Sequence, residues 1–423
     1  MLGANAAGLS AASRARKRDP RLRITVLERG PAASYSNCGL PYFLSGRLAS
    51  LDALRTHPVE YFRDRRGLDL RLGHEALELE PARHRVLVRD PAGDESWFHY
   101  DRLILATGAV PRWRPEPRRN VFAANSWSDA VALDAALRAG GIRRVAVVGG
   151  GYIGLETAEA LRRRGLDVTL YDAHAALLRS FDPELTAALP DRLAALGIGV
   201  RLGVRVQSLE GLDADAVINC AGLRPSSDLA RAAGLALGAS DAIRVDDLQQ
   251  TSHPAIFAAG DCAQTRHRLT SAPLWMPLAL PANQQGRVAG ANDPRLRCPG
   301  ALGTLVVPLA GCDFGRTGLS LAQARAAGFA AAAEEVAAHA QASYLDPQPI
   351  TLRLIYDTAA RRPLGVQLRG APGTVAARLD TAAAVLAAGL GLEQIEFLDS
   401  AYQPALAPLY EPLTIAAHNA HQR

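Results

Sequence analysis

The residues at 149–154 have the types and spacing that bind the phosphates of a dinucleotide. They read Gly-Gly-Gly-Tyr-Ile-Gly, follow a short apolar strand pattern and precede a helical pattern at 155–164. Gly149 permits a tight turn, Gly151 lets the backbone approach a pyrophosphate, and Gly154 lets the helix pack closely on the strand. The start of the helix then offers free N–H groups and a partial positive charge to the phosphates.

A carboxylate stands where such a site needs one. The strand predicted at 167–171 ends at Asp172, 18 residues after Gly154, and an acid there accepts hydrogen bonds from the adenosine ribose. It would repel a 2′-phosphate, so we expect NADH to be preferred over NADPH. His174 and Arg179 lie near enough in sequence to weaken that preference. A glycine turn with a purely structural role is the alternative.

A second unit of this kind, lacking its first strand, opens the chain. Gly3 and Gly8 bound a Gly-Ala-Asn-Ala-Ala-Gly turn before a predicted helix, and a strand ending at Glu28 places an acid 20 residues past Gly8. Only Met1 and Leu2 precede Gly3, so the central strand that should lead into the turn is missing. We expect the start to have been placed too far downstream; a damaged chain is the alternative.

Composition and charge disfavour several classes of function. Apolar residues make up 48% and charged residues 21% of the 423 residues, which is typical of a globular protein, and no apolar run approaches the ~20 residues of a membrane span. The net charge is +5, but all 47 basic residues except Lys17 are scattered arginines without interleaved aromatics, which argues against nucleic-acid binding. The first charges follow the apolar residues, the reverse of a signal peptide, so we expect a cytoplasmic protein.

The cysteines indicate neither a metal site nor a disulfide framework. They are odd in number and form no C-x-x-C pair: Cys38, Cys220, Cys262, Cys298 and Cys312. We therefore expect reduced thiols and no metal. An isolated cysteine is more often buried and inert than nucleophilic, so Cys38 is a candidate only because of its surroundings, Ser-Tyr-Ser-Asn-Cys-Gly-Leu-Pro-Tyr at 34–42.

Further elements complete the pattern. Predicted buried strands lead into two small-residue turns, Ala106-Thr107-Gly108 and Ala259-Gly260-Asp261. From about Ala301 the composition changes, and an alanine-rich helix at 319–327 followed by strand-like segments predicts another domain. Alanine-rich stretches are predicted to be helical throughout.

The segment 34–42, the two dinucleotide units and the turn at 259–261 together resemble the flavin-dependent pyridine nucleotide–disulfide oxidoreductases. The resemblance is to their single-cysteine branch, which includes coenzyme A-disulfide reductases, NADH oxidases, NADH peroxidases and persulfide or polysulfide reductases. It implies an α/β fold with two Rossmann-like dinucleotide-binding domains, the first split in sequence, and a homodimer. The implied domains are an FAD domain at 1–112 and 240–300, an inserted NAD(P) domain at 113–239, and a C-terminal α+β dimerisation domain at 301–423.

The resemblance also implies roles for individual residues. Tyr152 is similar to the gate that covers the flavin until the nicotinamide displaces it, and Glu156 would help to place the nicotinamide. Ordinary packing at a helix start is the alternative for Tyr152. The implied cofactor-binding residues are Gly3, Gly8, Glu28, Thr107, Gly108 and Asp261 for FAD, and Gly149, Gly151, Tyr152, Ile153, Gly154, Glu156, Asp172 and Gly222 in the remaining set.

Cys38 would work alone in this family. Two-cysteine members carry C-x-x-x-x-C, and the second position here is Phe43. Cys38 would therefore cycle through a mixed disulfide, a persulfide or a sulfenic acid. It must be a thiolate to attack sulfur, and the start of a helix at Gly39-Leu40-Pro41 would lower its pKa.

A tyrosine in the C-terminal part would complete the chemistry. Tyr402 resembles the family's tyrosine that reaches the partner subunit's cysteine, where a phenol could protonate the leaving thiolate. Plain interface packing is the alternative. The family often has a second aromatic four residues on, but here that residue is Leu406, with Tyr410 further along.

Several residues point to the substrate. Ser34 and Asn37 match the coenzyme A-disulfide reductase pattern, and Arg14 and Lys17 fall where that family meets coenzyme A, although a solvated helix face would look the same. Ala6 stands where similar oxidases and peroxidases carry a histidine. The sequence therefore predicts NAD(P)H-dependent reduction of a small disulfide or persulfide, preferably coenzyme A disulfide. The alternatives are an NADH oxidase or peroxidase, and a low-turnover flavin redox sensor.

Overall fold

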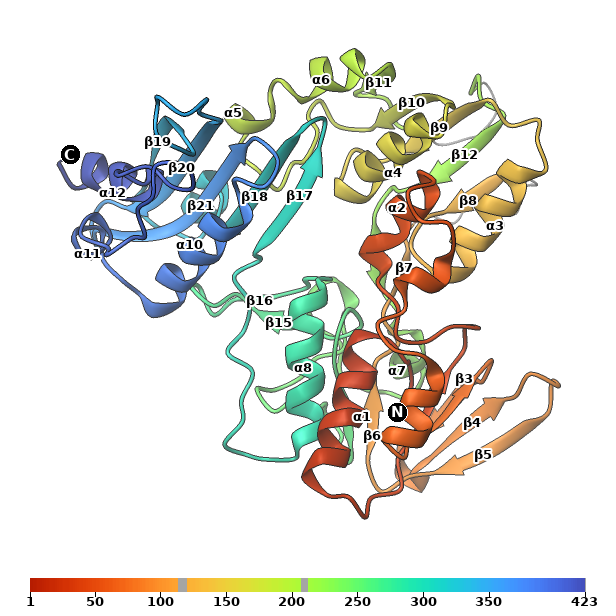
Figure 1. Ribbon diagram of the computed structural model, residues 1–423. Coiled ribbons are helices and arrows are strands. Elements are labelled where there is room, and N and C mark those ends of the chain that lie inside the picture. The colour runs from red at the N-terminus through yellow and green to blue at the C-terminus, as the bar shows by residue number, and fades with distance from the viewer. Residues whose placement is uncertain (113–119, 207–211, 423) are drawn as a thin grey trace.

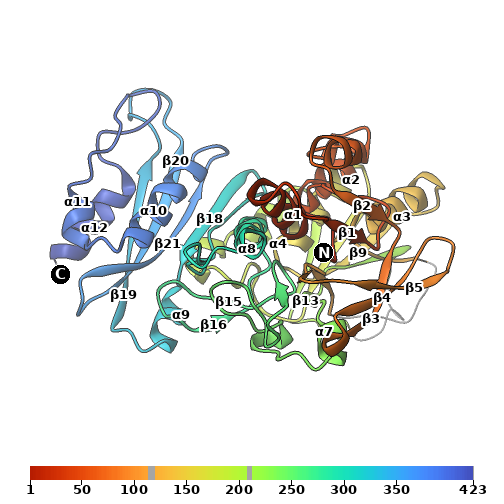
Figure 2. The ribbon, with the colours of Figure 1, turned by 90° about the horizontal axis from the view of Figure 1, so that it is seen from below.

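Residues 1–112, 120–206 and 212–422 are described by a computed structural model of the chain (Figure 1). The chain forms two mainly parallel sheets and a C-terminal part that begins near residue 301. The C-terminal part lies beside the parallel sheets, and both views show it separate from the first of them (Figures 1 and 2). No helix among these described residues combines the length and apolar character needed to cross a bilayer.

The first sheet is parallel and is completed at its centre by the start of the chain. Its paired strands are β2 (Asp69–Leu72) with β1 (Thr25–Glu28), and β6 (Leu103–Leu105) with β14 (Ile256–Ala258). Leu2 bridges Leu27 of β1 and Leu105 of β6 in parallel register, so it occupies the central strand position that the sequence leaves almost empty. The Met1 amino group donates to the Thr25 carbonyl oxygen at 2.8 Å.

Two helices pack on this sheet and on each other. They are α1 (Ala6–Arg18) and α8 (Ala279–Ala291), which lie side by side (Figure 1). Gly286 and Gly290 form the contact: a Cβ at either position would overlap the backbone of α1, at Ala7 and Ala11 respectively. The two helices can therefore approach closely only because α8 presents glycine at both positions.

The second sheet has five parallel strands in the order β11-β10-β9-β12-β8. Helix α4 (Tyr152–Arg163) connects β9 to β10, and α3 (Trp127–Arg138) precedes β9. Strands β10 and β12 flank β9 on opposite sides, which makes the carboxyl end of β9 the crevice where ligands of such sheets bind. The strand bounds are β8 (Val121–Ala123), β9 (Arg144–Val148), β10 (Asp167–Asp172), β11 (Ile198–Leu202) and β12 (Ala216–Asn219).

An antiparallel ribbon of β7 (Ala109–Pro111) and β13 (Leu223–Pro225) joins the two units. After β13 the chain returns to the first unit: α7 (Asp228–Ala232) packs on β3, and buried Ala230 shares a core with Leu103 and Ile256. Packing thus changes near β13, earlier than the boundary expected at 240. The boundary expected at 113 lies outside the described residues. The small sheet beside α7 is antiparallel: β3 (Glu75–Glu80), β4 (Arg85–Arg89) and β5 (Glu95–His99).

The C-terminal part is a five-stranded antiparallel sheet with helices packed on it, as expected of an α+β domain. Its strand order is β17-β18-β21-β20-β19. The helix predicted at 319–327 is present as α9 (Leu321–Ala326), but the alanine-rich 331–339 is strand β19, so the prediction of helix there is wrong. Pairing with β20 along its whole length outweighs the helical preference of alanine. The other elements are β17 (Leu305–Leu309), β18 (Cys312–Gly318), β20 (Pro349–Asp357), β21 (Arg362–Gly370), α10 (Ala376–Ala388), α11 (Leu392–Glu396) and α12 (Pro412–Gln422).

Buried charges fasten the C-terminal part to the second unit. Arg353 of β20 donates to Asp182 at 3.0 Å and to Glu184 at 2.8 Å, and the Arg353 and Asp182 side chains are almost fully buried. Close by, the rings of Phe181 and Phe314 meet edge to face with centroids 6.2 Å apart. Because a buried charge without its partner is costly, these contacts hold the second sheet and the C-terminal sheet together.

We predict that Gly286→Ala lowers the free energy of unfolding by about 2 kcal/mol, because the new methyl group overlaps the α1 backbone at Ala7 and the helices must separate. A thermal unfolding scan against the native chain measures this. The control is Arg287→Ala, an exposed position on the same helix, which should leave the midpoint unchanged. Equal midpoints for Gly286→Ala and the native chain would contradict the close contact.

Candidate active site

Cys38 lies at the start of a short helix that packs against the second unit. It sits in a single 3₁₀ turn (Asn37–Gly39) that runs directly into α2 (Leu40–Leu44). Helix α2 contacts α4, and Phe43 and Leu44 are buried in one core with Leu155. The side chain at position 43 is therefore core packing, and no second thiol accompanies Cys38 there.

Four of the predicted site residues, from both units, lie close enough to affect one another's charge. Cys38 comes from the loop after β1 and Asp261 from the turn after β14, while Tyr152 and Glu156 lie on the first turns of α4. Burial raises the pKa of Tyr152 to about 12, and the charges of Asp261, Cys38 and Glu156 add to that rise. The structure thus brings together residues that are more than 200 positions apart in sequence.

The electrostatics of this cluster do not favour a thiolate. Cys38 has exposed surface, yet burial of its sulfur side raises the pKa of the thiol, and the negative charges of Glu156 and Asp261 raise it further. The expectation of a lowered pKa is therefore wrong for the chain alone. Burial also raises the pKa of Glu156 to about 7, with a smaller contribution from Glu159, and that of Asp261 to about 6.

The first glycine turn packs closely against the protein's own backbone. Gly3 has φ +106°, and a Cβ there would overlap the Ala106 carbonyl, while one at Gly8 would overlap the carbonyl of Gly3. Glu28 accepts from the backbone N–H of Ala4 at 2.8 Å and of Gly30 at 2.7 Å, so the acid is fixed against the turn. This cradle fits the pyrophosphate and ribose of FAD.

The second turn repeats this geometry. Gly149 has φ +117° and lies against the carbonyl of Cys220, and a Cβ at Gly154 would overlap the Gly149 carbonyl. Gly151 has open space around its Cβ position, which is the room that a pyrophosphate needs. Asp172 accepts from Gly150 N–H at 2.6 Å.

Three of the remaining cofactor candidates, Thr107, Gly108 and Gly222, lie next to the ribbon between the units. Gly108 (φ +73°) and Gly222 (φ +95°) flank β7 and β13, and both need the left-handed region that glycine tolerates. The Thr107 hydroxyl donates to the Ser226 carbonyl at 2.6 Å, which ties it to the ribbon. Ile153 contributes its carbonyl oxygen to the Thr157 hydroxyl at 2.7 Å within α4.

The substrate candidates divide into surface and interior residues. Ser34 is buried, with its hydroxyl 2.6 Å from that of Thr56, so its side chain serves the loop itself. Lys17 is exposed on the last turn of α1. Arg14, one turn earlier, has a buried Nε without a hydrogen-bond partner among the described residues.

Hydrogen bonds that link three asparagines were not predicted from the sequence, although Asn37 was itself a predicted substrate contact. Asn37 donates to the Asn125 carbonyl at 3.2 Å, and Asn5 donates to the Asn37 side-chain oxygen at 3.4 Å. The three residues connect the first glycine turn, the Cys38 loop and the entry to α3. The available signal was Asn5 itself, which stands where the fingerprint has its middle glycine.

No described contact joins Tyr402 to the Cys38 segment within one chain. It is in the segment between α11 and α12, which both views place on the side of the C-terminal part remote from α2 (Figures 1 and 2). Half of its surface is exposed, and its hydroxyl bonds with that of exposed Tyr344.

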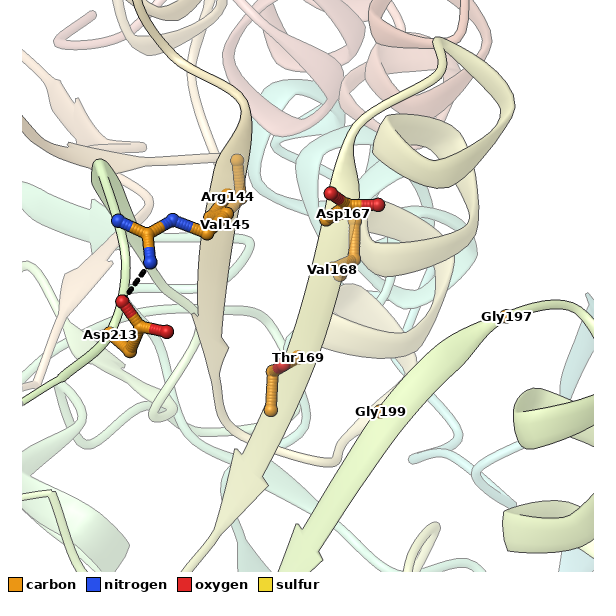
Figure 3. Close-up of a pocket in the computed structure, with 8 residues that line it drawn as sticks. All are labelled: Arg144, Val145, Asp167, Val168, Thr169, Gly197, Gly199 and Asp213. Atoms are coloured by element: carbon orange, nitrogen blue, oxygen red, sulfur yellow. Dashed lines mark hydrogen bonds and ion pairs between the residues drawn. The ribbon is translucent and has the colours of Figure 1, made fainter.

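An open hollow of about 290 Å³ is lined by residues other than these (Figure 3). Arg144 and Asp167, the first residues of β9 and β10, line it, and Arg144 pairs with Asp213 across it. Ligands of open parallel sheets bind at the opposite, carboxyl edge, where the glycine turn follows β9. We therefore do not assign a nucleotide to this hollow. No group of three or more metal-ligating side chains forms within the described ranges.

Comparison with known proteins identifies the family. The model of the pyridine nucleotide-disulphide oxidoreductase family matches residues 1–286. The chain belongs to this family. The family and the α/β fold predicted from the sequence are thus confirmed.

Relatives of this oxidoreductase family member have several activities in their names. The NAD(P)H coenzyme A polysulfide/persulfide reductase of Pyrococcus horikoshii is 35% identical over 437 residues, covering 99% of this chain and 97% of the relative. The crystal structure of reduced Bacillus anthracis CoADR-RHD superposes with a TM-score of 0.95 at 28% identity, covering 100% of this chain and 79% of that one. The water-forming NADH oxidase of Lactobacillus brevis bound to NADH has a TM-score of 0.93 at 27% identity, covering 100% and 97%.

We predict that Glu156→Gln lowers the pKa of Cys38, because it removes a negative charge that opposes ionisation of the thiol. In the native chain, Glu156 ionises as the pH rises through about 7, so this opposition grows over the range where the thiol should begin to react. The pH dependence of iodoacetamide labelling of the Cys38 peptide, read by mass spectrometry, measures the shift. The control is Glu393→Gln, on exposed α11 surface. An unchanged or raised midpoint in Glu156→Gln would contradict the electrostatic effect of Glu156 on the Cys38 thiol.

Proposed function

We propose that this chain is an FAD-dependent NAD(P)H oxidoreductase that reduces a small disulfide or persulfide, preferably coenzyme A disulfide, through Cys38. The observation that carries the proposal is the contact of the Cys38 segment with α4, the helix that opens the second dinucleotide turn. A lone thiol at the junction of two dinucleotide cradles suits the transfer of an electron pair to sulfur. The polysulfide/persulfide reductase named above is consistent with this assignment.

The two cradles supply the places for the cofactors. The Gly3 turn with Glu28 would hold the pyrophosphate and ribose of FAD, with Asp261 on the ribityl chain, and the Gly149 turn with Asp172 would hold NAD(P)H. When bound, FAD supplies the means of passing the two electrons of NAD(P)H to sulfur. The residues of the chain would position these cofactors, exclude water from the site, and donate or accept protons.

Cys38 carries the covalent step. Its thiolate attacks one sulfur of the disulfide, so that a mixed disulfide forms and the other half leaves as a thiolate that takes up a proton. Delivery of one electron pair then breaks the mixed disulfide, restores the Cys38 thiolate and releases the second thiol. One NAD(P)H and one proton thus convert one disulfide into two thiols. Glu156, with a pKa of about 7, can hold or release a proton beside this sulfur at neutral pH.

The substrate proposal rests on two basic residues of α1 and on the residue next to Cys38. Lys17 is exposed on the last turn of α1 and Arg14 is half-buried one turn earlier, and we infer that these two cations meet the phosphates of coenzyme A. Asn37 adjoins Cys38, where an amide can contact the substrate chain. Ser34 contributes by fixing the loop through Thr56.

A second subunit would complete the site. The segment around Tyr402 exposes a group of large apolar side chains at 63–77% of their surface: Phe397, Leu406, Leu409 and Tyr410. Such a patch is typical of a protein–protein interface, and we infer that it forms a homodimer. Tyr402 would then approach the partner's thiol, where its phenol could protonate the leaving thiolate. We also place the enzyme in the cytoplasm, where its thiols stay reduced.

An NADH oxidase is the second candidate, because a water-forming NADH oxidase has nearly the same fold. Ala6 in the first glycine turn provides no acid–base group for oxygen or peroxide chemistry. Disulfide reduction therefore has the stronger support.

We predict that Cys38→Ser lowers kcat/KM for coenzyme A disulfide by at least about 1000-fold, since the nucleophile is lost. Thiol release with NADH and NADPH measures this, with oxygen consumption recorded in parallel. The control is Cys298→Ser, a buried thiol outside the cluster, which should stay near native activity. Full disulfide turnover in Cys38→Ser would refute the proposed mechanism, and oxygen consumption indifferent to added disulfide would favour the oxidase.

We predict that Leu406→Glu combined with Leu409→Glu converts the dimer into monomers, because two charges would be buried in an apolar interface. Light scattering during gel filtration should give twice the 44.8 kDa chain mass for the native protein and the single mass for the variant. Val131→Glu, on an exposed apolar residue of α3, is the matched control and should stay dimeric. A native protein that elutes as a monomer would exclude this interface.

A further inference from the structure

The carboxylate of Asp172 is already held by three N–H donors. One oxygen accepts from Gly150 N–H at 2.6 Å, and the other accepts from His174 twice, from its backbone N–H at 2.7 Å and from its ring Nδ1 at 2.8 Å. Burial alone would raise the pKa of Asp172, but these hydrogen bonds outweigh it and lower the pKa. The carboxylate is therefore ionised and accepts only, so the proton of the imidazole must sit on Nδ1.

The first dinucleotide unit offers an internal comparison. Glu28 has the same place after its strand and also takes two backbone N–H groups, from Ala4 and Gly30. No side chain donates to Glu28 among the described residues. The imidazole is thus an addition specific to the second unit.

This addition changes what Asp172 can offer to a ribose. A carboxylate oxygen accepts about two hydrogen bonds in its plane, and the oxygen facing His174 already has two. A ribose diol that uses both oxygens of the acid would have to displace the imidazole. Asp172 is also mostly covered, with 12% of its side chain exposed. The preference of Asp172 for a ribose without a 2′-phosphate is therefore weakened.

The same loop carries two side chains with N–H donors, His174 and, five residues further on, Arg179. The His174 side chain is 44% exposed, which leaves its ring open to solvent. Arg179 is exposed and makes no hydrogen bond or ion pair within the described residues. The loop cannot swing away freely, because Leu178 N–H donates to the Gly150 carbonyl at 3.1 Å. A 2′-phosphate at this position would meet donors as well as a carboxylate.

We propose that His174 sets the pyridine-nucleotide specificity of this chain: by occupying Asp172 it lets the site accept NADPH alongside NADH. This inference rests on the proposed function and names its electron donor more closely. His174 acts through Asp172, so it is a specificity-determining residue rather than a catalytic one.

The test compares the binding of two ligands that differ only in the 2′-phosphate. NAD⁺ and NADP⁺ are titrated calorimetrically into the flavin-loaded full chain, which gives dissociation constants without turnover. In His174→Ala the freed Asp172 should bind the ribose of NAD⁺ and repel the phosphate of NADP⁺, moving the affinity ratio about tenfold toward NAD⁺. In His174→Asn an amide N–H can replace Nδ1–H, so the ratio should stay near the native value.

The outcomes separate this inference from the proposed function. A tenfold change in His174→Ala that is restored in His174→Asn supports it. A ratio within twofold of native in His174→Ala, or a change toward NADP⁺, overturns it and leaves the proposed function standing. If neither nucleotide binds the native chain, the second cradle is no nucleotide site and both proposals fail.

Discussion

The packing of α2 on α4 is the contact on which the rest of the site depends. Helix α2 begins two residues after Cys38, and α4 begins at Tyr152, so burying Phe43 and Leu44 against Leu155 fixes the thiol relative to the second glycine turn. The far side of α4 is fixed as well, since Glu159 accepts from the Ala310 N–H of the C-terminal part. The antiparallel ribbon of β7 and β13 also links the second sheet to the first unit. Because a closely packed core resists displacement of its side chains, this core sets the distance between the Cys38 thiol and the Gly149 turn.

Charge then decides the resting state of the thiol. Burial and two carboxylates, Glu156 and Asp261, raise the pKa of Cys38 and keep it protonated in the chain alone. A protonated thiol resists solvent oxidants, because oxidation proceeds through the thiolate. Reactivity therefore depends on what neutralises the surrounding charge, and Glu156, with its pKa of about 7, is the group most easily neutralised at physiological pH. We expect the Cys38 thiol to be unreactive until the ligands of the site are bound.

The glycine turns could be predicted from sequence because steric demands leave little choice. Gly3, Gly8, Gly149 and Gly154 stand where a side chain would overlap the backbone. The environment of Cys38 could not be predicted, because the carboxylates that raise its pKa come from positions 156 and 261, on other elements. The sequence suggested only a helix start, whose effect is local and favours a thiolate.

Other differences also come from contacts distant in sequence. Ser34 stays a predicted substrate contact, but its hydroxyl bond with Thr56, 22 residues further on, could not be predicted. The return of α7 to the first unit depends on packing with β3, far earlier in the chain. The alanine-rich segment 331–339 forms strand β19 instead of a helix because it pairs with β20 at the edge of the sheet. In each case the local structural preference could be predicted from the sequence, but the distant residues that determine the structure could not.

The most direct measurement is an anaerobic absorbance titration of the FAD-loaded protein with NADH, followed by addition of coenzyme A disulfide. If Cys38 passes electrons from the nucleotide cradles to a disulfide, the flavin absorbance falls with NADH and returns on adding the disulfide, with two thiols released per disulfide. A flavin that stays reduced until oxygen or peroxide is admitted would contradict disulfide reduction as the function of this chain.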